Sequence, residues 1–277
     1  MGMRINTNVS SLAAQRALGV TKNNLDSNFR KLSTGERITR ASDDAAGLAI
    51  SEKLKAHIRG LRQAKRNSDD GISLIQTAEG GLNEVSSIII RLRELAIQAA
   101  SDTVGETERG YSDIEFQNLK EEIQRIAKGS EFNGRKLLDG TGGLVEIQVG
   151  IHNDPTQDRI KYDSTETDAS MESLGIHGET IGNKEGAQLS LSKLDNALVR
   201  INGVRANLGA LQNRLQSASN TIAVSEENLS AANSRIRDVD VAAETAELAK
   251  NNILTQAGVS VLAQANQNSS AALKLIG

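Results

Sequence analysis

The side chains best suited to proton transfer or metal binding near neutral pH are three histidines, His57, His152 and His177. They lie far apart in the sequence, and none has a second histidine at the spacing that places two ligands on one helix face. The glycines near residue 140 are not followed by the Lys-Ser/Thr pair of a phosphate-binding loop. Because the chain has no cysteine, thiolate catalysis and cysteine-based metal sites are excluded. We therefore expect no enzyme activity, no cofactor and no metal site.

A pair of carboxylates, Asp43 and Asp44, offers a different kind of chemistry, namely cation binding. Together with Ser42 they stand directly before the first apolar positions of a predicted helix. Short polar and acidic side chains at that place cap the free backbone N–H groups of the first turn. We favour capping over a metal role for these residues.

Composition limits the class of protein further. The chain has 277 residues, aromatic residues make up only 2%, and the formal net charge is −3. Mixed charges with so small a net value do not favour a nucleic-acid partner, and no apolar run approaches the ~20 residues of a membrane span. The N-terminus also lacks the apolar segment of a secretory signal, so we expect neither membrane insertion nor cleavage of a leader. A core built from aliphatic residues and alanine suits a thin helical bundle.

Apolar residues recur at every seventh position over a long stretch of the second half of the chain, with a row of mostly small residues three positions later. This spacing predicts one long helix with a heptad seam, and such a seam needs a partner helix of similar length. The repeating positions are Leu194, Ile201, Leu208, Leu215, Ile222, Leu229 and Ile236.

The partner lies earlier, from His57 to Ala100, where the same spacing returns. Lys65 and Glu79 are polar interruptions of it, and the glycine pair Gly80-Gly81 in the middle of the helix predicts either a kink or a close helix approach. The apolar or small seam positions are Ile58, Leu61, Ser68, Ile72, Ile75, Leu82, Val85, Ile89, Leu92, Ala96 and Ala99.

Between the two seam helices the pattern changes. A shorter helix is predicted at about 112–128. Alternating apolar residues then predict strands at 144–149 and 159–163, which form a β-hairpin within about 140–165. Thin apolar stripes at helical spacing mark both chain ends, at 4–33 and 243–277. We predict a mainly α fold, in which the N- and C-terminal halves form a long antiparallel bundle or coiled coil with a small β-hairpin region in the middle.

Several sequence blocks resemble bacterial flagellin, the subunit of the flagellar filament. The most specific is 32–50, which reads LSTGERITRASDDAAGLAI. Further similar blocks lie at 5–8, 62–71, 91–98, 131–134, 213–214, 228–229, 234–236 and 238–240. The resemblance implies a self-assembling structural subunit of the extracellular filament, exported unfolded through the flagellar type III apparatus and polymerised at the filament tip. The large variable outer domains of many family members are expected to be absent.

The resemblance also implies a division into domains. Residues 1–44 and 237–277 form the two parts of a filament-core domain, and 45–236 form an outer helical domain that bears the hairpin. The residues expected to drive assembly are Ile5, Val9, Leu12, Leu25, Leu32, Leu248, Leu254, Val261, Leu262, Leu273 and Leu275. Because the terminal stripes are thin, we expect both ends to be loose in the monomer and to order on assembly.

The partners implied by the resemblance are other copies of the chain, an export chaperone, the filament cap and the hook-junction proteins. A flagellin-sensing Toll-like receptor is a further expected partner, with Arg91, Leu95, Gln98 and Glu115 as the matching contacts. Ordinary seam packing of Leu95 and an exposed ion pair of Arg91 are the alternative interpretation. Two alternative functions remain, a hook–filament junction protein with similar helical ends and a coiled-coil binding module.

Overall fold

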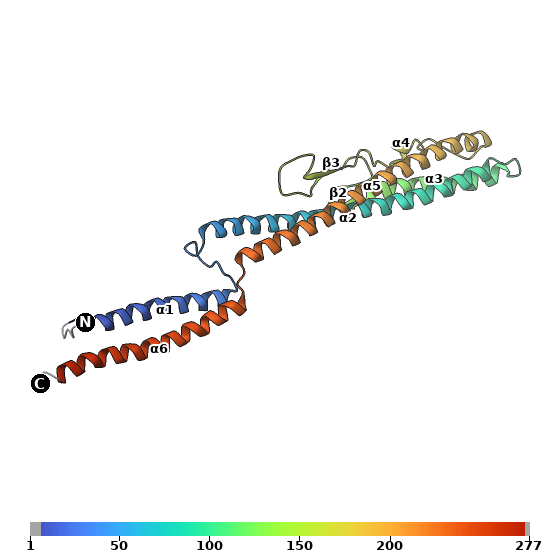
Figure 1. The fold of residues 1–277 in the computed structure, drawn as a ribbon. Helices are drawn as coiled ribbons and strands as arrows, with labels where there is room; N and C mark the ends of the chain where they lie inside the picture. The colour runs from blue at the N-terminus through green and yellow to red at the C-terminus, as the bar shows by residue number, and fades with distance from the viewer. Residues whose placement is uncertain (1–6, 275–277) are drawn as a thin grey trace. The chain divides into compact units, whose positions relative to one another are not determined.

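The structure, a computed structural model, describes residues 7–274 and the side chains of 7–267. Six helices and four short strands make up this part of the chain (Figure 1). The helices are α1 (Val9–Thr34), α2 (Ala45–Ala99), α3 (Glu106–Gly129), α4 (Met171–Leu174), α5 (Lys184–Arg237) and α6 (Val241–Lys274). The strands are β1 (Glu131–Phe132), β2 (Arg135–Lys136), β3 (Leu144–Gln148) and β4 (Arg159–Asp163). The predicted fold class, mainly α with a small antiparallel strand region, is confirmed.

The chain divides into two compact units. One consists of the residues up to 56 and those from 228 onward, and the other of residues 57–227. The domain division predicted at 44/45 and 236/237 stays a prediction. Within 7–274, no helix is long and apolar enough to cross a membrane.

The unit 57–227 is built on the two predicted seams. Ion pairs join Arg62 to Glu226 and Arg93 to Asp195, so this part of α2 runs antiparallel to α5. Between these pairs the heptad positions of both helices are largely buried, because each seam covers the apolar row of the other. Leu208 is 2% exposed, and the fully buried seam residues include Ile75, Leu82, Val85, Ile89, Leu92, Leu194 and Leu215.

The two adjacent glycines of α2, Gly80 and Gly81, have different surroundings. A Cβ built on Gly81 would lie 2.7 Å from both Leu138 Cδ1 and Ser130 Oγ, whereas one built on Gly80 would meet nothing within 4 Å. Gly81 therefore permits a close approach of the chain that follows α3. Gly80 lies in open space.

The predicted β-hairpin is present, and β3 pairs with β4 in antiparallel register from Leu144–Asp163 to Gln148–Arg159. It lies against α2, where the Asn67 side chain donates to the Gln148 carbonyl at 3.0 Å. A second, smaller hairpin pairs β1 with β2. Its turn consists of Asn133 and Gly134, both with positive φ, which is the backbone conformation that an Asn-Gly turn supplies.

Two helices begin earlier than the sequence pattern predicted. The shorter helix starts at Glu106 instead of 112, because the Glu108 side chain accepts a hydrogen bond from Gly105 N and caps the first turn. The long helix starts at Lys184 instead of Leu194, and Asn183 Oδ1 accepts from Gly186 N at its beginning. Polar caps, not apolar residues, define both starts.

A buried lysine holds α3 to the segment that leads into α5. Lys120 is 3% exposed and donates to the carbonyls of His177 and Glu179, each at 2.8 Å. On the same helix, Asp113 accepts from the Ile181 backbone N–H at 2.8 Å. Burial lowers the pKa of Lys120, against the opposing influence of nearby carboxylates.

Candidate assembly surface

Helices α1 and α6 form an antiparallel pair (Figure 1). Lys31 pairs with Glu244 at 3.5 Å near one end, and the Asn8 side chain donates to the Ala265 carbonyl at 2.8 Å near the other. The side chains that face the partner helix follow unbroken 3-4 spacing and are buried or half-buried. On α1 they are Ser11, Ala14, Leu18, Thr21, Leu25, Asn28 and Leu32, and on α6 they are Glu244, Leu248, Asn251, Thr255, Gly258, Leu262 and Ala265.

Much of this seam is polar or small. Asn251 donates to Asn28 at 3.4 Å, and Ser11 donates to Asn266 at 2.9 Å. A Cβ built on Gly258 would lie 3.2 Å from Leu18 Cδ1, so the leucine fills the space that the glycine leaves. A seam of this composition buries little apolar area per turn, so the pair gains little from its own contact.

Large apolar side chains lie instead on the outer faces of the same two helices. Ile253 is 66% exposed and Val9 is 61% exposed. The others are Leu12, Val20 and Phe29 on α1 and Val241, Leu254, Val259 and Val261 on α6. Exposed apolar residues in such density mark an interaction surface.

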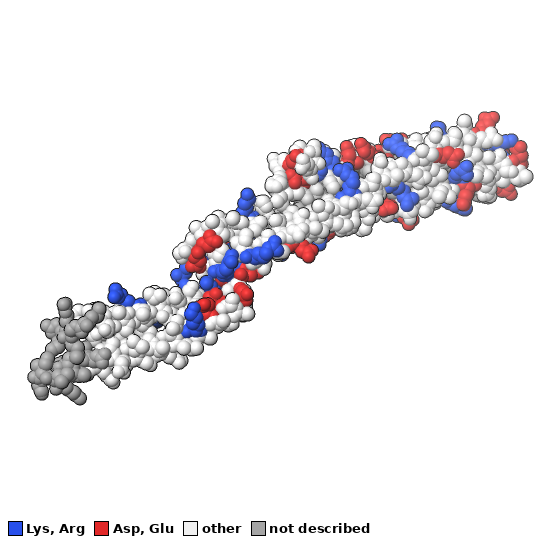
Figure 2. All heavy atoms as spheres, viewed as in Figure 1, with Lys and Arg blue, Asp and Glu red and all other residues white. Residues whose placement is uncertain are grey.

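Few charges accompany these apolar residues. The sequence has no Asp, Glu, Lys or Arg between Lys250 and Lys274. On the face shown in Figure 2, α1 and α6 accordingly carry few charged side chains. A helix surface without charge to solvate it is suited to contact with other protein.

A groove runs along one side of the pair, between α1 and α6. It has a volume of about 260 Å³, and its lining includes the small residues Ala17 and Ala257. Leu254 and Val261 line it on α6, and Leu18 on α1. The surface therefore offers both apolar projections and a shallow apolar hollow, the two complementary parts of a packed interface.

The predicted assembly residues divide into two classes. Leu25, Leu32, Leu248 and Leu262 are half-buried in the seam, whereas Val9, Leu12, Leu254 and Val261 are exposed. Ile5 and Leu275 lie outside the described residues, and Leu273 lies in α6 at a position whose side chain is not described. The role of all these residues in assembly stays a prediction.

One arginine, which the sequence did not predict, joins the connection after α1 to the connection before α6. Arg237, with 14% of its side chain exposed, pairs with Glu36 at 2.9 Å and also with Glu52. The backbone follows the same path, since Val239 N donates to the Gly35 carbonyl at 3.0 Å. In the sequence, the only signal was an arginine just before a break in the heptad period.

The adjacent carboxylates Asp43 and Asp44 cap backbone groups. Asp44 Oδ1 accepts from Gly47 N at 2.8 Å, in the first turn of α2. Asp43 accepts from the Thr39 hydroxyl at 2.9 Å and from the Arg40 N–H at 3.0 Å. These hydrogen bonds, the one from Thr39 first, hold the pKa of Asp43 below its ordinary value of 3.8.

The residues predicted for receptor contact lie in the unit 57–227, on α2 and α3. Arg91 is half-exposed and donates to Glu115 and to Glu94, each at 3.0 Å, and these bonds, the one to Glu94 first, raise its pKa. Gln98 is exposed. Leu95, in contrast, is 2% exposed and packs in the core, which fits the alternative of ordinary seam packing, and the receptor role of all four residues stays a prediction.

The three histidines do not converge. His57 and His152 place their ring centroids 6.2 Å apart, edge to face, while the His177 carbonyl serves Lys120. Over the described residues, no three or more His, Asp or Glu side chains gather as metal ligands would.

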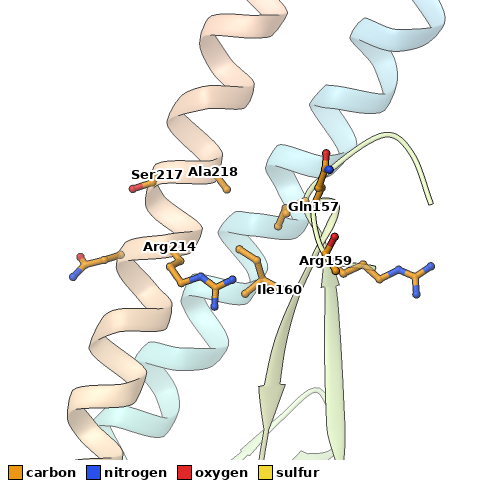
Figure 3. A pocket seen from close by; sticks show the side chains of 9 residues that line it. Gln157, Arg159, Ile160, Arg214, Ser217 and Ala218 are labelled. Atoms are coloured by element: carbon orange, nitrogen blue, oxygen red, sulfur yellow. The ribbon is translucent and has the colours of Figure 1, made fainter. Parts of the chain in front are cut away.

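A hollow of about 360 Å³ lies between α5 and the β3–β4 hairpin. In Figure 3 the Arg214 side chain extends from α5 toward Ile160, whereas the Arg159 guanidinium points away from the helix. Arg159 instead pairs with Glu146 at 3.3 Å. This hollow brings together no nucleophile and general base, so its geometry supports no catalytic step.

Comparison with known proteins agrees with this geometry. Two family models match, the bacterial flagellin N-terminal helical region over residues 5–142 and the bacterial flagellin C-terminal helical region over residues 191–276. A flagellin of Halalkalibacterium halodurans is 47% identical over 274 residues, covering 99% of this chain and 100% of that protein. The flagellar filament 30.7 kDa core protein of Treponema maltophilum is 41% identical over 286 residues, with 99% and 100% covered.

Among solved structures, Bacillus cereus flagellin is 33% identical with a TM-score of 0.51, covering 57% of this chain and 88% of that one. The two family models together account for both helical halves of the sequence. The chain belongs to the bacterial flagellin family.

Proposed function

We propose that this chain is the structural subunit of an extracellular flagellar filament that serves motility, and that α1 and α6 hold the filament together. Relatives that match it nearly from end to end are named flagellin or flagellar filament core protein. The observation that carries the proposal is the set of large apolar side chains exposed on both terminal helices, Ile253 and Val9 foremost. No site for substrate chemistry competes with this surface among the described residues.

The energetics favour folding of the ends that is coupled to assembly. Ordering one residue costs about 1–2 kcal/mol of backbone entropy, and apolar burial returns about 25 cal/mol per Å². The seam between α1 and α6 contains Asn28, Asn251, Thr21 and Thr255, so the helix pair alone recovers little of that cost. Neighbouring subunits that cover the outer apolar faces supply the missing burial.

The test removes all but the first three residues of α6 by deleting residues 244–277. The unit 57–227 has its own buried core, so circular dichroism of the truncated chain should still show cooperative melting. Seeded polymerisation should fail, because half of the exposed apolar surface is gone. Filaments of normal length from the truncated chain would instead place the assembly contacts in the remaining unit.

A junction protein between hook and filament is the alternative for the same helical ends. The filament subunit is favoured because relatives that match over 99% of this chain are named flagellin or flagellar filament core protein. Electron microscopy of the purified protein separates the two functions. A filament subunit forms long filaments from the pure protein, whereas a junction protein adds a few subunits to a preformed end.

Export imposes a further requirement on the same surface. We propose that the chain passes unfolded through the flagellar type III apparatus, with an export chaperone covering α6 and with the filament cap and hook-junction proteins as partners at the filament ends. The support is the stretch of α6 between Lys250 and Lys274, which has no charged residue and exposes large apolar side chains that would aggregate if left uncovered at high concentration. A chaperone that binds the full chain should lose affinity for the chain without 244–277. Equal affinity would place its site elsewhere.

For the Toll-like receptor we propose a surface centred on Arg91, with Gln98 and Glu115 beside it. Ile90, Ile97 and Ile114 are each about half exposed or more around this arginine, and a charged centre with an apolar rim is typical of interface hot spots. Leu95 supports the surface from below by packing.

The receptor test uses Arg91→Glu, with Arg93→Glu as the matched control. Arg93 lies on the same helix and pairs with Asp195 at 2.6 Å, so the control loses one exposed ion pair where Arg91→Glu loses the two to Glu94 and Glu115. Receptor activation by monomers should fall at least tenfold for Arg91→Glu and little for the control. An unchanged response to Arg91→Glu would remove this residue from the receptor surface.

A further inference from the structure

The centre of the α1–α6 seam contains a pair of buried amides. Asn28 and Asn251 are each 6% exposed, and Asn251 Nδ2 donates to Asn28 Oδ1 at 3.4 Å. Leucines occupy the neighbouring seam positions, Leu25 and Leu32 on α1 and Leu248 on α6. Other asparagines of the same helices, such as Asn24 and Asn252, are exposed and free to contact water.

A buried amide behaves differently from a leucine when two helices slide past each other. Heptad seams resemble themselves after every seven residues, so leucines find new leucine-lined space after such a shift. A shift of one heptad displaces α6 by about 10 Å and separates the two amides. In the shift that brings Ala265 opposite Leu18, Asn28 would face Gly258 instead of Asn251. The amide–amide hydrogen bond is then lost and Asn28 is left facing a residue without a side chain, which costs free energy that the paired arrangement avoids.

We propose that Asn28 and Asn251 determine the register of the α1–α6 pair. They select the observed pairing of the two helices over pairings shifted by one heptad. This proposal rests on the proposed function, since it specifies how the assembling helices present their outer apolar faces. The outer residues Val9, Leu12, Ile253 and Val259 keep fixed relative positions only if the register is fixed. The amide pair is therefore a specificity-determining contact for assembly.

The remaining polar contacts of the seam do not replace the amide pair. Lys31 and Glu244 lie near the end of the seam with 26% and 15% of their side chains exposed, so a shifted lysine can be solvated by water. Thr21 and Thr255 donate to carbonyls of their own helices, Ala17 and Asn251, and keep those bonds in any register. Ser11 and Asn8 also donate across the seam, to Asn266 and to the Ala265 carbonyl, but near the N-terminal end of α1. The contact at the centre of the seam is therefore the one between Asn28 and Asn251.

Register can be measured by disulfide formation, because the chain has no cysteine of its own. Leu18→Cys with Gly258→Cys reports the observed register, since these positions face each other. Leu18→Cys with Ala265→Cys reports a shift of α6 by one heptad. Both cysteine pairs are introduced into three backgrounds of the full chain. These are the native sequence, the double variant Asn28→Leu/Asn251→Leu, and the matched control Asn24→Leu/Asn252→Leu, which adds leucine at exposed positions. Oxidation is carried out on filaments where they form and on the soluble chain in every case.

In the native background the in-register pair should form disulfide at least tenfold faster than the shifted pair. In Asn28→Leu/Asn251→Leu the two rates should come within about threefold, whereas the control should keep the native ratio. An unchanged ratio in the leucine variant, or equal rates in the native background, would overturn the inference. Failure of the native chain to form filaments would count against the proposed function instead, whereas native filaments with an unchanged ratio in the leucine variant would count against this inference alone.

Discussion

Two adjacent glycines in α2 should respond in opposite ways to the same substitution. Alanine at an exposed helical position gains about 0.5–1 kcal/mol over glycine, so Gly80→Ala should stabilise the unit 57–227 by that amount. Gly81→Ala has the same propensity gain, but its Cβ would lie 2.7 Å from Leu138 Cδ1 and from Ser130 Oγ. Leu138 is fully buried and cannot swing into solvent. Overpacking of this kind costs about 1–3 kcal/mol, which is the expected difference between the two variants.

Urea unfolding of the full chain measures this difference. Both tyrosines, Tyr111 and Tyr162, belong to the unit 57–227 and there is no tryptophan, so tyrosine fluorescence reports this unit alone. Equal stabilisation by the two substitutions would refute the close approach of the chain after α3 to α2. A difference with Gly81→Ala the less stable variant would support it.

Three further predictions concern other parts of the chain. Leu82→Ala, at a fully buried seam position, should lower the free energy of unfolding in urea by about 2–5 kcal/mol. Leu189→Ala, at a 66% exposed position, should change it by less than about 0.5 kcal/mol. Because the pKa of Asp43 is depressed in the folded chain, its contribution to the free energy of unfolding should be complete above about pH 4 and disappear as the pH falls through the lowered pKa. An NMR titration with Asp43→Asn as the control would detect the lowered pKa. Arg237→Met should lower the free energy of local opening of the segments around Glu36 and Arg237 by about 1 kcal/mol, which is measured as faster amide exchange in these segments. Arg235→Met, at an exposed position, should leave that exchange unchanged.

The heptad seams of α2 and α5 could be predicted because apolar burial alone defines them. Leu82, Ile89 and Leu208 recur at the expected spacing and are buried in the structure. The β3–β4 hairpin was predictable for a similar reason, since its alternation is apolar on one face. Where burial of apolar side chains decides the structure, periodicity is sufficient.

The terminal seam was harder to predict because it does not follow the apolar residues. Of the apolar positions predicted for the first helix, Leu25 and Leu32 lie half-buried in the seam, yet Val9 and Leu12 are exposed. The true inner face carries Ser11 and Asn28 at positions that continue the 3-4 spacing of the leucines. Treating polar residues as outward-facing hid this regular repeat.

The contacts of Arg237 and Lys120 could not be predicted from periodicity either. Both side chains bridge segments far apart in the sequence, Arg237 reaching Glu36 and Lys120 reaching the His177 carbonyl. The partner of a buried charge depends on how the chain folds back, and only the three-dimensional arrangement supplies it.

Amide hydrogen exchange compared between soluble chain and assembled filament tests the central claim most directly. We propose that α1 and α6 order fully only when neighbouring subunits cover their exposed apolar faces. Protection of amides near Val20 and Ile253 should therefore rise at least tenfold on polymerisation, while amides near Leu82, in an already buried core, should change little. Equal protection of the terminal helices in soluble chain and filament would contradict the claim.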